Sequence, residues 1–190
     1  MSVINIYCDG SLMEAPFQAG VGIHGYLDDK MIFDEAIGFA RQGHTSRTVE
    51  LYAVLIAILA VIELDEEINA DEIIIWTDQI EFVAHINART KAPSKKVKQV
   101  QKDIYNDILG LVLLPKSQKI RIKFQKSHAG FFPNVRSNTL ARAAAKGLPV
   151  MQLREQQQSI QNNHFVYAKN MGIRDTQVAR EAMEQRMMNG

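Results

Sequence analysis

The longest patterned segment of the chain is residues 48–64, which read TVELYAVLIAILAVIEL. Its apolar residues recur every three or four positions, the spacing of one helical face. That face consists of Leu51, Leu55, Ile58, Leu59 and Ile62. Thr48 can cap the start of the helix, and the remaining faces are also apolar. The pattern therefore predicts a deeply buried helix with Glu50 in its first turn.

Strands are predicted on both sides of this helix. After it, residues 71–77 (DEIIIWT) form a short apolar run typical of a central parallel strand. Before it, residues 3–8 (VINIYC) predict a strand that ends in a turn at Asp9-Gly10-Ser11. Residues 18–26 and 31–39 predict two antiparallel strands that complete a meander, although the glycines weaken both predictions.

The rest of the chain alternates helices with one more strand. Residues 79–88, 97–114 and 134–146 predict helices, and Trp76 is expected in the core. Residues 119–126 (KIRIKFQK) alternate, with Ile120, Ile122 and Phe124 on one face and bases on the other, which is typical of an edge strand. This order predicts an α/β fold in which helices flank a mixed sheet.

Composition bounds the class of protein. The chain has 190 residues, of which 46% are hydrophobic and 23% charged, typical of a globular protein with one domain and an appendage. A lone cysteine, Cys8, excludes an internal disulfide and fits a reducing compartment. The first residues lack a signal-peptide pattern, and the apolar run 51–62 is shorter than the roughly 20 residues that cross a bilayer. We therefore expect a cytoplasmic protein without a membrane partner.

The net charge of +1 hides an asymmetry along the chain. Residues 1–85 carry three bases and fifteen acids, a net charge of −12, whereas residues 86–190 carry nineteen bases and six acids, a net charge of +13. This division fits an acidic centre beside a polyanion-binding surface. It also fits two halves whose charges intermingle in the folded protein.

Three carboxylates stand at positions from which they can meet. Asp9 follows the first predicted strand, Glu50 opens the long helix, and Asp78 follows the strand at 71–77. Clustered carboxylates repel one another unless a cation neutralises them, and their oxygens suit Mg²⁺ or Mn²⁺. Each residue alone also has an ordinary structural role, as a turn residue, a helix-start acid or a helix cap.

Taken together and in this order, four motifs resemble the type 1 ribonuclease H family. They are IYCDGS at 6–11, VELYAVLIAILAVIE at 49–63, IIIWTDQIEFV at 73–83, and SHAGFFPNVRSNTLARAAA at 127–145. The resemblance covers about residues 3–147. It implies a ribonuclease H-like domain over residues 1–147, with a mixed five-stranded sheet, followed by a helical C-terminal extension of unknown role over residues 151–190.

The resemblance also implies the roles of individual residues. Asp9, Glu50 and Asp78 correspond to the metal-binding carboxylates, and two Mg²⁺ or Mn²⁺ ions are expected with substrate. His128 corresponds to a loop histidine that helps to transfer protons or release product. Asn138 stands where the family usually has a fourth carboxylate, so a carbonyl oxygen replaces a charged ligand.

Two further departures lie near the site. Gln79 replaces a common serine after Asp78, and the next aromatic, Phe82, comes one residue late. Ser46 and Arg47 stand where the family commonly has asparagines that contact nucleic acid.

Nucleic-acid contacts are expected from residues of the motifs and from the basic loop that precedes the predicted helix at 97–114. The resemblance suggests Gly10, Ser11 and Ser46 near the ribose hydroxyl and Asn134 in the fourth motif. Phosphate contacts are expected from Arg89, Lys91, Lys95, Lys96 and Lys98. Alternatively, this basic segment is an ordinary solvated surface loop without a role in binding.

The sequence is therefore interpreted as an endonuclease that hydrolyses the RNA strand of RNA–DNA hybrids by a two-metal mechanism. The alternative is a weak or inactive nucleic-acid-binding protein of the same fold, with Asn138 marking lost chemistry. A proofreading-type exonuclease ranks last, because its first strand would need a second acid at Ser11. The extension at 151–190 is left open as a site for a protein or nucleic-acid partner.

Overall fold

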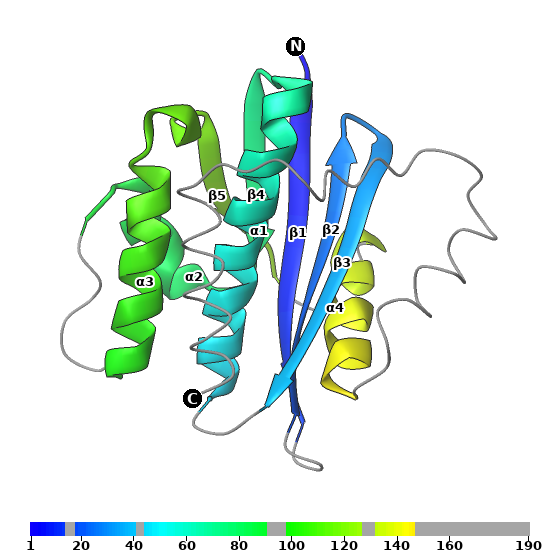
Figure 1. Cartoon of the computed structure of the whole chain (residues 1–190), viewed down its shortest axis with the longest axis vertical. Coiled ribbons are helices and arrows are strands. Elements are labelled where there is room, and N and C mark those ends of the chain that lie inside the picture. The colour runs from blue at the N-terminus through cyan, green and yellow to red at the C-terminus, as the bar shows by residue number, and fades with distance from the viewer. Residues whose placement is uncertain (14–17, 41–43, 91–97, 127–131, 147–190) are drawn as a thin grey trace.

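Five strands form one mixed sheet in the order β3-β2-β1-β4-β5. The computed structural model describes residues 1–13, 18–40, 44–90, 98–126 and 132–146, so the extension at 151–190 lies outside the described residues. The strands are β1 (Val3–Leu12), β2 (Gln18–Leu27), β3 (Lys30–Ala40), β4 (Glu72–Thr77) and β5 (Ile120–Phe124). The first three strands pair antiparallel, and β4 and β5 add to β1 in parallel (Figure 1). This arrangement confirms the predicted mixed sheet.

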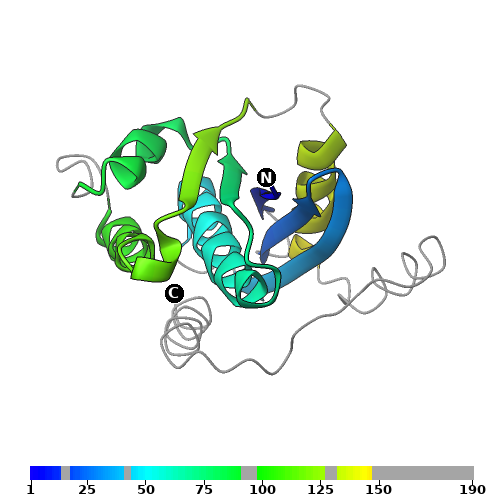
Figure 2. The ribbon, with the colours of Figure 1, turned by 90° about the horizontal axis from the view of Figure 1, so that it is seen from above.

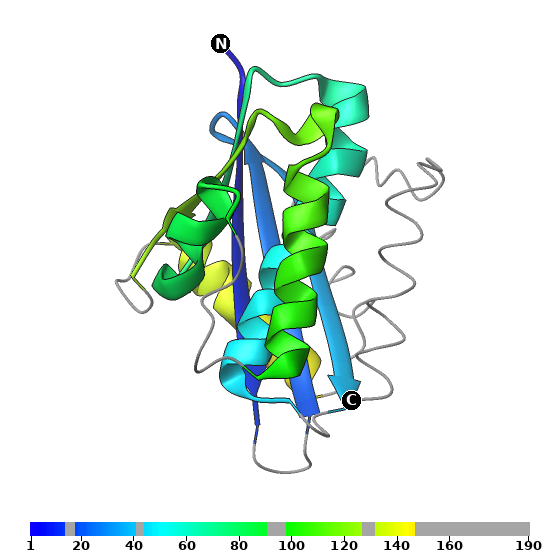
Figure 3. The same cartoon turned by 90° about the vertical axis from the view of Figure 1, so that its left-hand side faces the viewer.

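Helices cover both faces of the sheet. They are α1 (Ser46–Ile68), α2 (Ile80–Asn87), α3 (Gln99–Val112) and α4 (Phe132–Ala145), with a 3-10 turn, η1 (Pro115–Ser117). Figure 2 shows α1 on one face and α4 on the other. Figure 3 shows α3 alongside α1, which it contacts. None of the helices in these described segments combines the length and hydropathy that a membrane span requires.

The core lies between α1 and the sheet. Residues 48–59 of α1 are buried without interruption, as the all-round apolar pattern predicted. They pack on the isoleucines of the central strands, of which Ile6 and Ile75 are fully buried. The helix begins earlier than predicted, because the side chain of Thr45, not of Thr48, caps it by accepting a hydrogen bond from the N–H of Thr48.

The opposite face holds α4 close to the backbone of β2 and β3. A Cβ atom added at Gly20, Gly22 or Gly38 would clash with backbone atoms of α4. The glycines that weakened the strand prediction therefore let a helix lie directly on the sheet. Arg136 of α4 also pairs with the buried Asp34 of β3, at 2.9 Å between Nη2 and Oδ2.

Three local predictions are wrong. The first strand continues through Asp9-Gly10-Ser11 to Leu12, because β2 pairs with it as far as Ala19 opposite Leu12. Trp76 is only half-buried, on the face away from α1, where it stacks on Tyr7. Phe124 is 41% exposed, because it is the last residue of the edge strand.

Candidate metal centre

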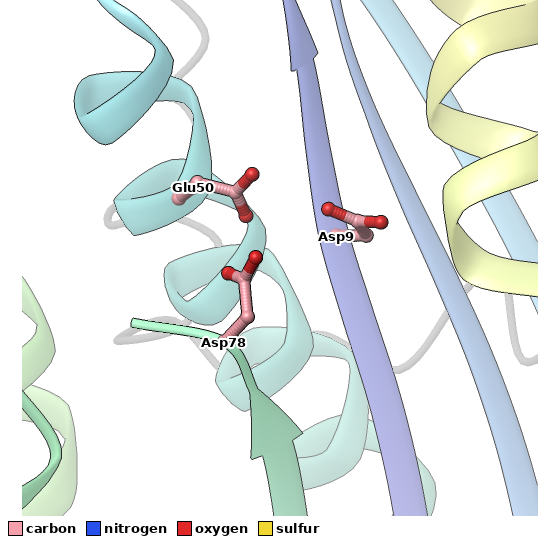
Figure 4. A group of neighbouring side chains, drawn as sticks. All are labelled: Asp9, Glu50 and Asp78. Atoms are coloured by element: carbon pink, nitrogen blue, oxygen red, sulfur yellow. The ribbon is translucent and has the colours of Figure 1, made fainter. Parts of the chain in front are cut away.

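Three carboxylates from remote parts of the sequence converge at one point of the fold. Asp9 lies on β1, Glu50 in the second turn of α1, and Asp78 directly after β4. One oxygen from each of them lies within 4.8 Å of the others. Figure 4 shows Glu50 and Asp78 facing each other, with Asp9 opposite them on β1. The three residues that the sequence predicted as metal ligands are therefore neighbours in space.

The local pairing of β1 explains why they meet here. β4 runs beside β1 only as far as Trp76 opposite Tyr7, whereas β2 stays paired with β1 to Leu12. Among the described strands, the edge of β1 that faces β4 therefore has no strand partner from just before Asp9 onward. The first turns of α1 and the residue after β4 occupy that edge.

Gly10 brings the helix close to the strand at this edge. Its backbone N–H donates a 2.9 Å hydrogen bond to Oε2 of Glu50. A Cβ atom at Gly10 would lie 2.8 Å from the backbone N of Glu50 and from the carbonyl carbon of Val49. Only glycine permits this approach, so the glycine of the first motif serves the geometry of the acidic cluster.

The cluster carries an electrostatic cost. Asp9 and Glu50 are each only 8% exposed. Burial raises the pKa of Glu50 well above its usual range, and the charges of Asp9 and Asp78 raise it further, against the hydrogen bond from Gly10. Burial followed by these three carboxylates also raises the pKa of Cys8. A buried glutamate with a raised pKa beside two further carboxylates is an environment that a cation stabilises.

The donor set fits a hard divalent cation. Asp9, Glu50 and Asp78 all offer carboxylate oxygens, the ligands that Mg²⁺ and Mn²⁺ prefer. α4 crosses the sheet at the same level, since the carbonyl of Ser137 lies against Gly22, the β2 partner of Asp9. Asn138, the next residue of α4, is half-buried, and its role as a further ligand stays a prediction.

The other predicted site residues are distributed around this centre. Ser11 is half-buried on β1, and Ser46 is the exposed first residue of α1. Asn134 is 9% exposed on α4. Arg89 and Lys98 are exposed, beyond the end of α2 and at the start of α3. His128, Lys91, Lys95 and Lys96 lie outside the described residues.

One pair beside the centre was not predicted from the sequence. Arg47 on α1 and Glu81 on α2 form an ion pair at 3.0 Å between Nη2 and Oε2. The sequence signal was their spacing, because each stands three residues from a cluster carboxylate. Their mutual contact joins positions 34 residues apart and was not visible in the sequence.

Comparisons with known proteins agree with this architecture. A model of the RNase H family matches residues 1–146. A ribonuclease H of Campylobacter jejuni is 32% identical over 148 residues, which cover 76% of this chain and 92% of that protein. In fold, the chain is similar to LC11-RNase H1, crystallised in complex with RNA/DNA hybrid, at a TM-score of 0.60 and 16% identity, covering 76% of this chain and 97% of that one. RNase H1 of Halobacterium salinarum gives a TM-score of 0.54 at 16% identity, with coverages of 76% and 98%. The family match over residues 1–146 and the 32% identity to a relative covered over 92% of its length show that this chain belongs to the ribonuclease H family.

Proposed function

We propose that this chain hydrolyses the RNA strand of RNA–DNA hybrids with two magnesium or manganese ions. The observation that carries the proposal is the convergence of Asp9, Glu50 and Asp78 within 4.8 Å. Family membership supports the hybrid as substrate, and a relative in fold was crystallised with RNA/DNA hybrid. Metal ions bound at the cluster would activate the attacking water and stabilise charge on the leaving 3′ oxygen.

In this proposal the residues of the chain hold the metal ions and orient the groups that bind them. The three carboxylates bind the cations, and the hydrogen bond from Gly10 orients one oxygen of Glu50. Asn138 supplies a neutral carbonyl ligand, so it contributes less charge than a fourth carboxylate would. His128 serves proton transfer or product release. The products carry 5′-phosphate and 3′-hydroxyl ends.

The test is cleavage of an end-labelled RNA–DNA hybrid by the full chain with magnesium, with manganese and with chelator. Single-stranded RNA and duplex DNA are run alongside. We expect metal-dependent cuts confined to the RNA strand of the hybrid. Cuts that persist in chelator, or cuts in duplex DNA at the same rate, would contradict the proposal.

The second candidate function is hybrid binding without cleavage. It is favoured by Asn138 alone, because this residue removes one charged ligand from the site. Binding of the hybrid without cuts under any metal would establish it. Retention of Asp9, Glu50 and Asp78 in one cluster favours the enzyme.

A further inference from the structure

An exposed ion pair stands beside the acidic cluster and bridges the two helices that flank it. Nη2 of Arg47 lies 3.0 and 3.1 Å from the two carboxylate oxygens of Glu81. Arg47 precedes Glu50 by three residues on α1, a spacing that places both on neighbouring parts of one helical face. Glu81 follows Asp78 by three residues, in the first turn of α2. The pair is therefore anchored next to two of the three cluster carboxylates.

Arg47 is one of few bases in the first half of the sequence. Residues 1–85 contain only three bases, Lys30, Arg41 and Arg47. Lys30 opens β3 opposite Leu27, which itself pairs with Ile4 near the start of β1, remote from Asp9. Arg41 lies outside the described residues. Among the bases of residues 1–85 that the structure describes, Arg47 is therefore the one beside the cluster.

We propose that Arg47 contacts a backbone phosphate of the bound nucleic acid next to the scissile one, and that Glu81 competes with this phosphate for the guanidinium. The inference rests on the proposed function, because it assumes that the scissile phosphate lies at the carboxylate cluster. Three residues of helix advance about 4.5 Å, so Arg47 stands less than one helical turn from Glu50. A strand whose scissile phosphate lies at the cluster therefore passes close to Arg47.

The strength of the pair permits this exchange. The side chains of Arg47 and Glu81 are 41% and 54% exposed, and exposed ion pairs are weak. A guanidinium forms strong, bidentate hydrogen bonds with a phosphate. Binding of a strand replaces Glu81 by a phosphate as the partner of Arg47. Glu81 therefore lowers the affinity for nucleic acid, because the free energy of its ion pair with Arg47 must be overcome.

The experiment measures hybrid binding in an Asp9→Asn background with magnesium, so that cleavage does not interfere. Dissociation constants are determined for this parent and for the parent with Arg47→Gln, with Glu81→Gln and with both, over a series of salt concentrations. Melting curves check that each variant is folded. Glu66→Gln is the matched control, because Glu66 also forms an exposed ion pair, with Lys116, but about 28 Å away along α1.

We expect Glu81→Gln to lower the dissociation constant roughly two- to fivefold at low salt, the ratio to which the usual strength of an exposed pair corresponds. Arg47→Gln should weaken binding and reduce the salt slope by about 0.9, the loss of one phosphate contact. The effect of Glu81→Gln should disappear when Arg47 is also replaced, and Glu66→Gln should have no effect.

Two results would overturn the inference while the proposed function stands. One is hybrid binding that Glu81→Gln leaves unchanged or weakens, as for a purely structural bridge. The other is a gain that persists in the Arg47→Gln background, which would mean that Glu81 merely repels the strand. A parent that does not bind the hybrid at all would instead overturn both proposals.

Discussion

Gly10 and Glu50 join the strand and the helix of the acidic cluster through a 2.9 Å hydrogen bond from the backbone N–H of Gly10 to Oε2 of Glu50. The same approach leaves no room for a side chain, since a Cβ at Gly10 would lie 2.8 Å from the backbone N of Glu50. The position of Glu50 relative to Asp9 on the strand therefore depends on the absence of a side chain at Gly10.

Gly10→Ala should separate α1 from β1 and weaken metal binding. Overpacking of this kind costs about 1–3 kcal/mol of unfolding free energy. Titration calorimetry with Mg²⁺ and thermal melting measure the two effects. The matched control is Gly110→Ala in α3, where a Cβ meets no atom within 4 Å and should stabilise the helix by up to about 1 kcal/mol. Equal metal affinity for the Gly10→Ala variant and the unaltered chain would contradict this role of Gly10.

Asp9→Asn should abolish cleavage of the hybrid while binding survives. The substitution preserves size but removes a charged ligand from the cluster, and the phosphate contacts elsewhere remain. Cleavage of labelled hybrid and its binding are measured in parallel. Asp103→Asn is the control, because Asp103 bonds to Gln99 within α3. Cleavage by the Asp9→Asn variant at the original rate would exclude Asp9 from the active site.

Asn138→Asp should raise activity or lower the magnesium concentration for half-maximal rate. The change adds a charged oxygen ligand at the level of Asp9 along the sheet. Rates are compared over a magnesium series, with Asn106→Asp on the exposed side of α3 as a control of equal charge. If neither the rate nor the metal requirement moves, Asn138 does not sit at the metals.

The pH dependence follows from the raised pKa of Glu50. The unfolded carboxyl titrates near 4.5, whereas the folded one keeps its proton to higher pH. Between these two values the folded chain holds a proton that the unfolded chain has released, so the stability of the metal-free protein falls as pH rises. Metal binding displaces this proton, so magnesium affinity should rise over the same window.

Melting temperatures in chelator and in magnesium, measured from acidic to neutral pH, check this expectation. The increase in melting temperature on adding magnesium should be small at acidic pH and larger at neutral pH. In Glu50→Gln the fall of metal-free stability with pH should be reduced. An increase with magnesium that does not vary with pH would show that Glu50 is ionised throughout.

Much of the fold was predictable because period and order are local properties. The apolar run of residues 48–64 specified the buried helix, and the run at 73–75 specified the central strand. The end of β1 was mispredicted, because Asp9-Gly10 is a common turn sequence and only the pairing with β2 keeps it extended.

The site was less predictable because it depends on contacts between remote segments. The motif order suggested that Asp9, Glu50 and Asp78 would meet, and they do. The Arg47–Glu81 pair depends instead on how α1 and α2 are oriented, which no local pattern encodes.

The two strands that neighbour β1 differ in length, and this difference determines where the acidic cluster forms on the sheet. β4 has six residues and β1 has ten, so the ladder on one side of β1 stops while the other continues. A longer β4 would occupy the backbone N–H of Gly10. Because β4 ends before this point, the N–H donates to the side chain of Glu50 instead. An insertion that extended β4 by two residues would continue its pairing along β1. The sheet would remain well formed, but the acidic cluster would be lost.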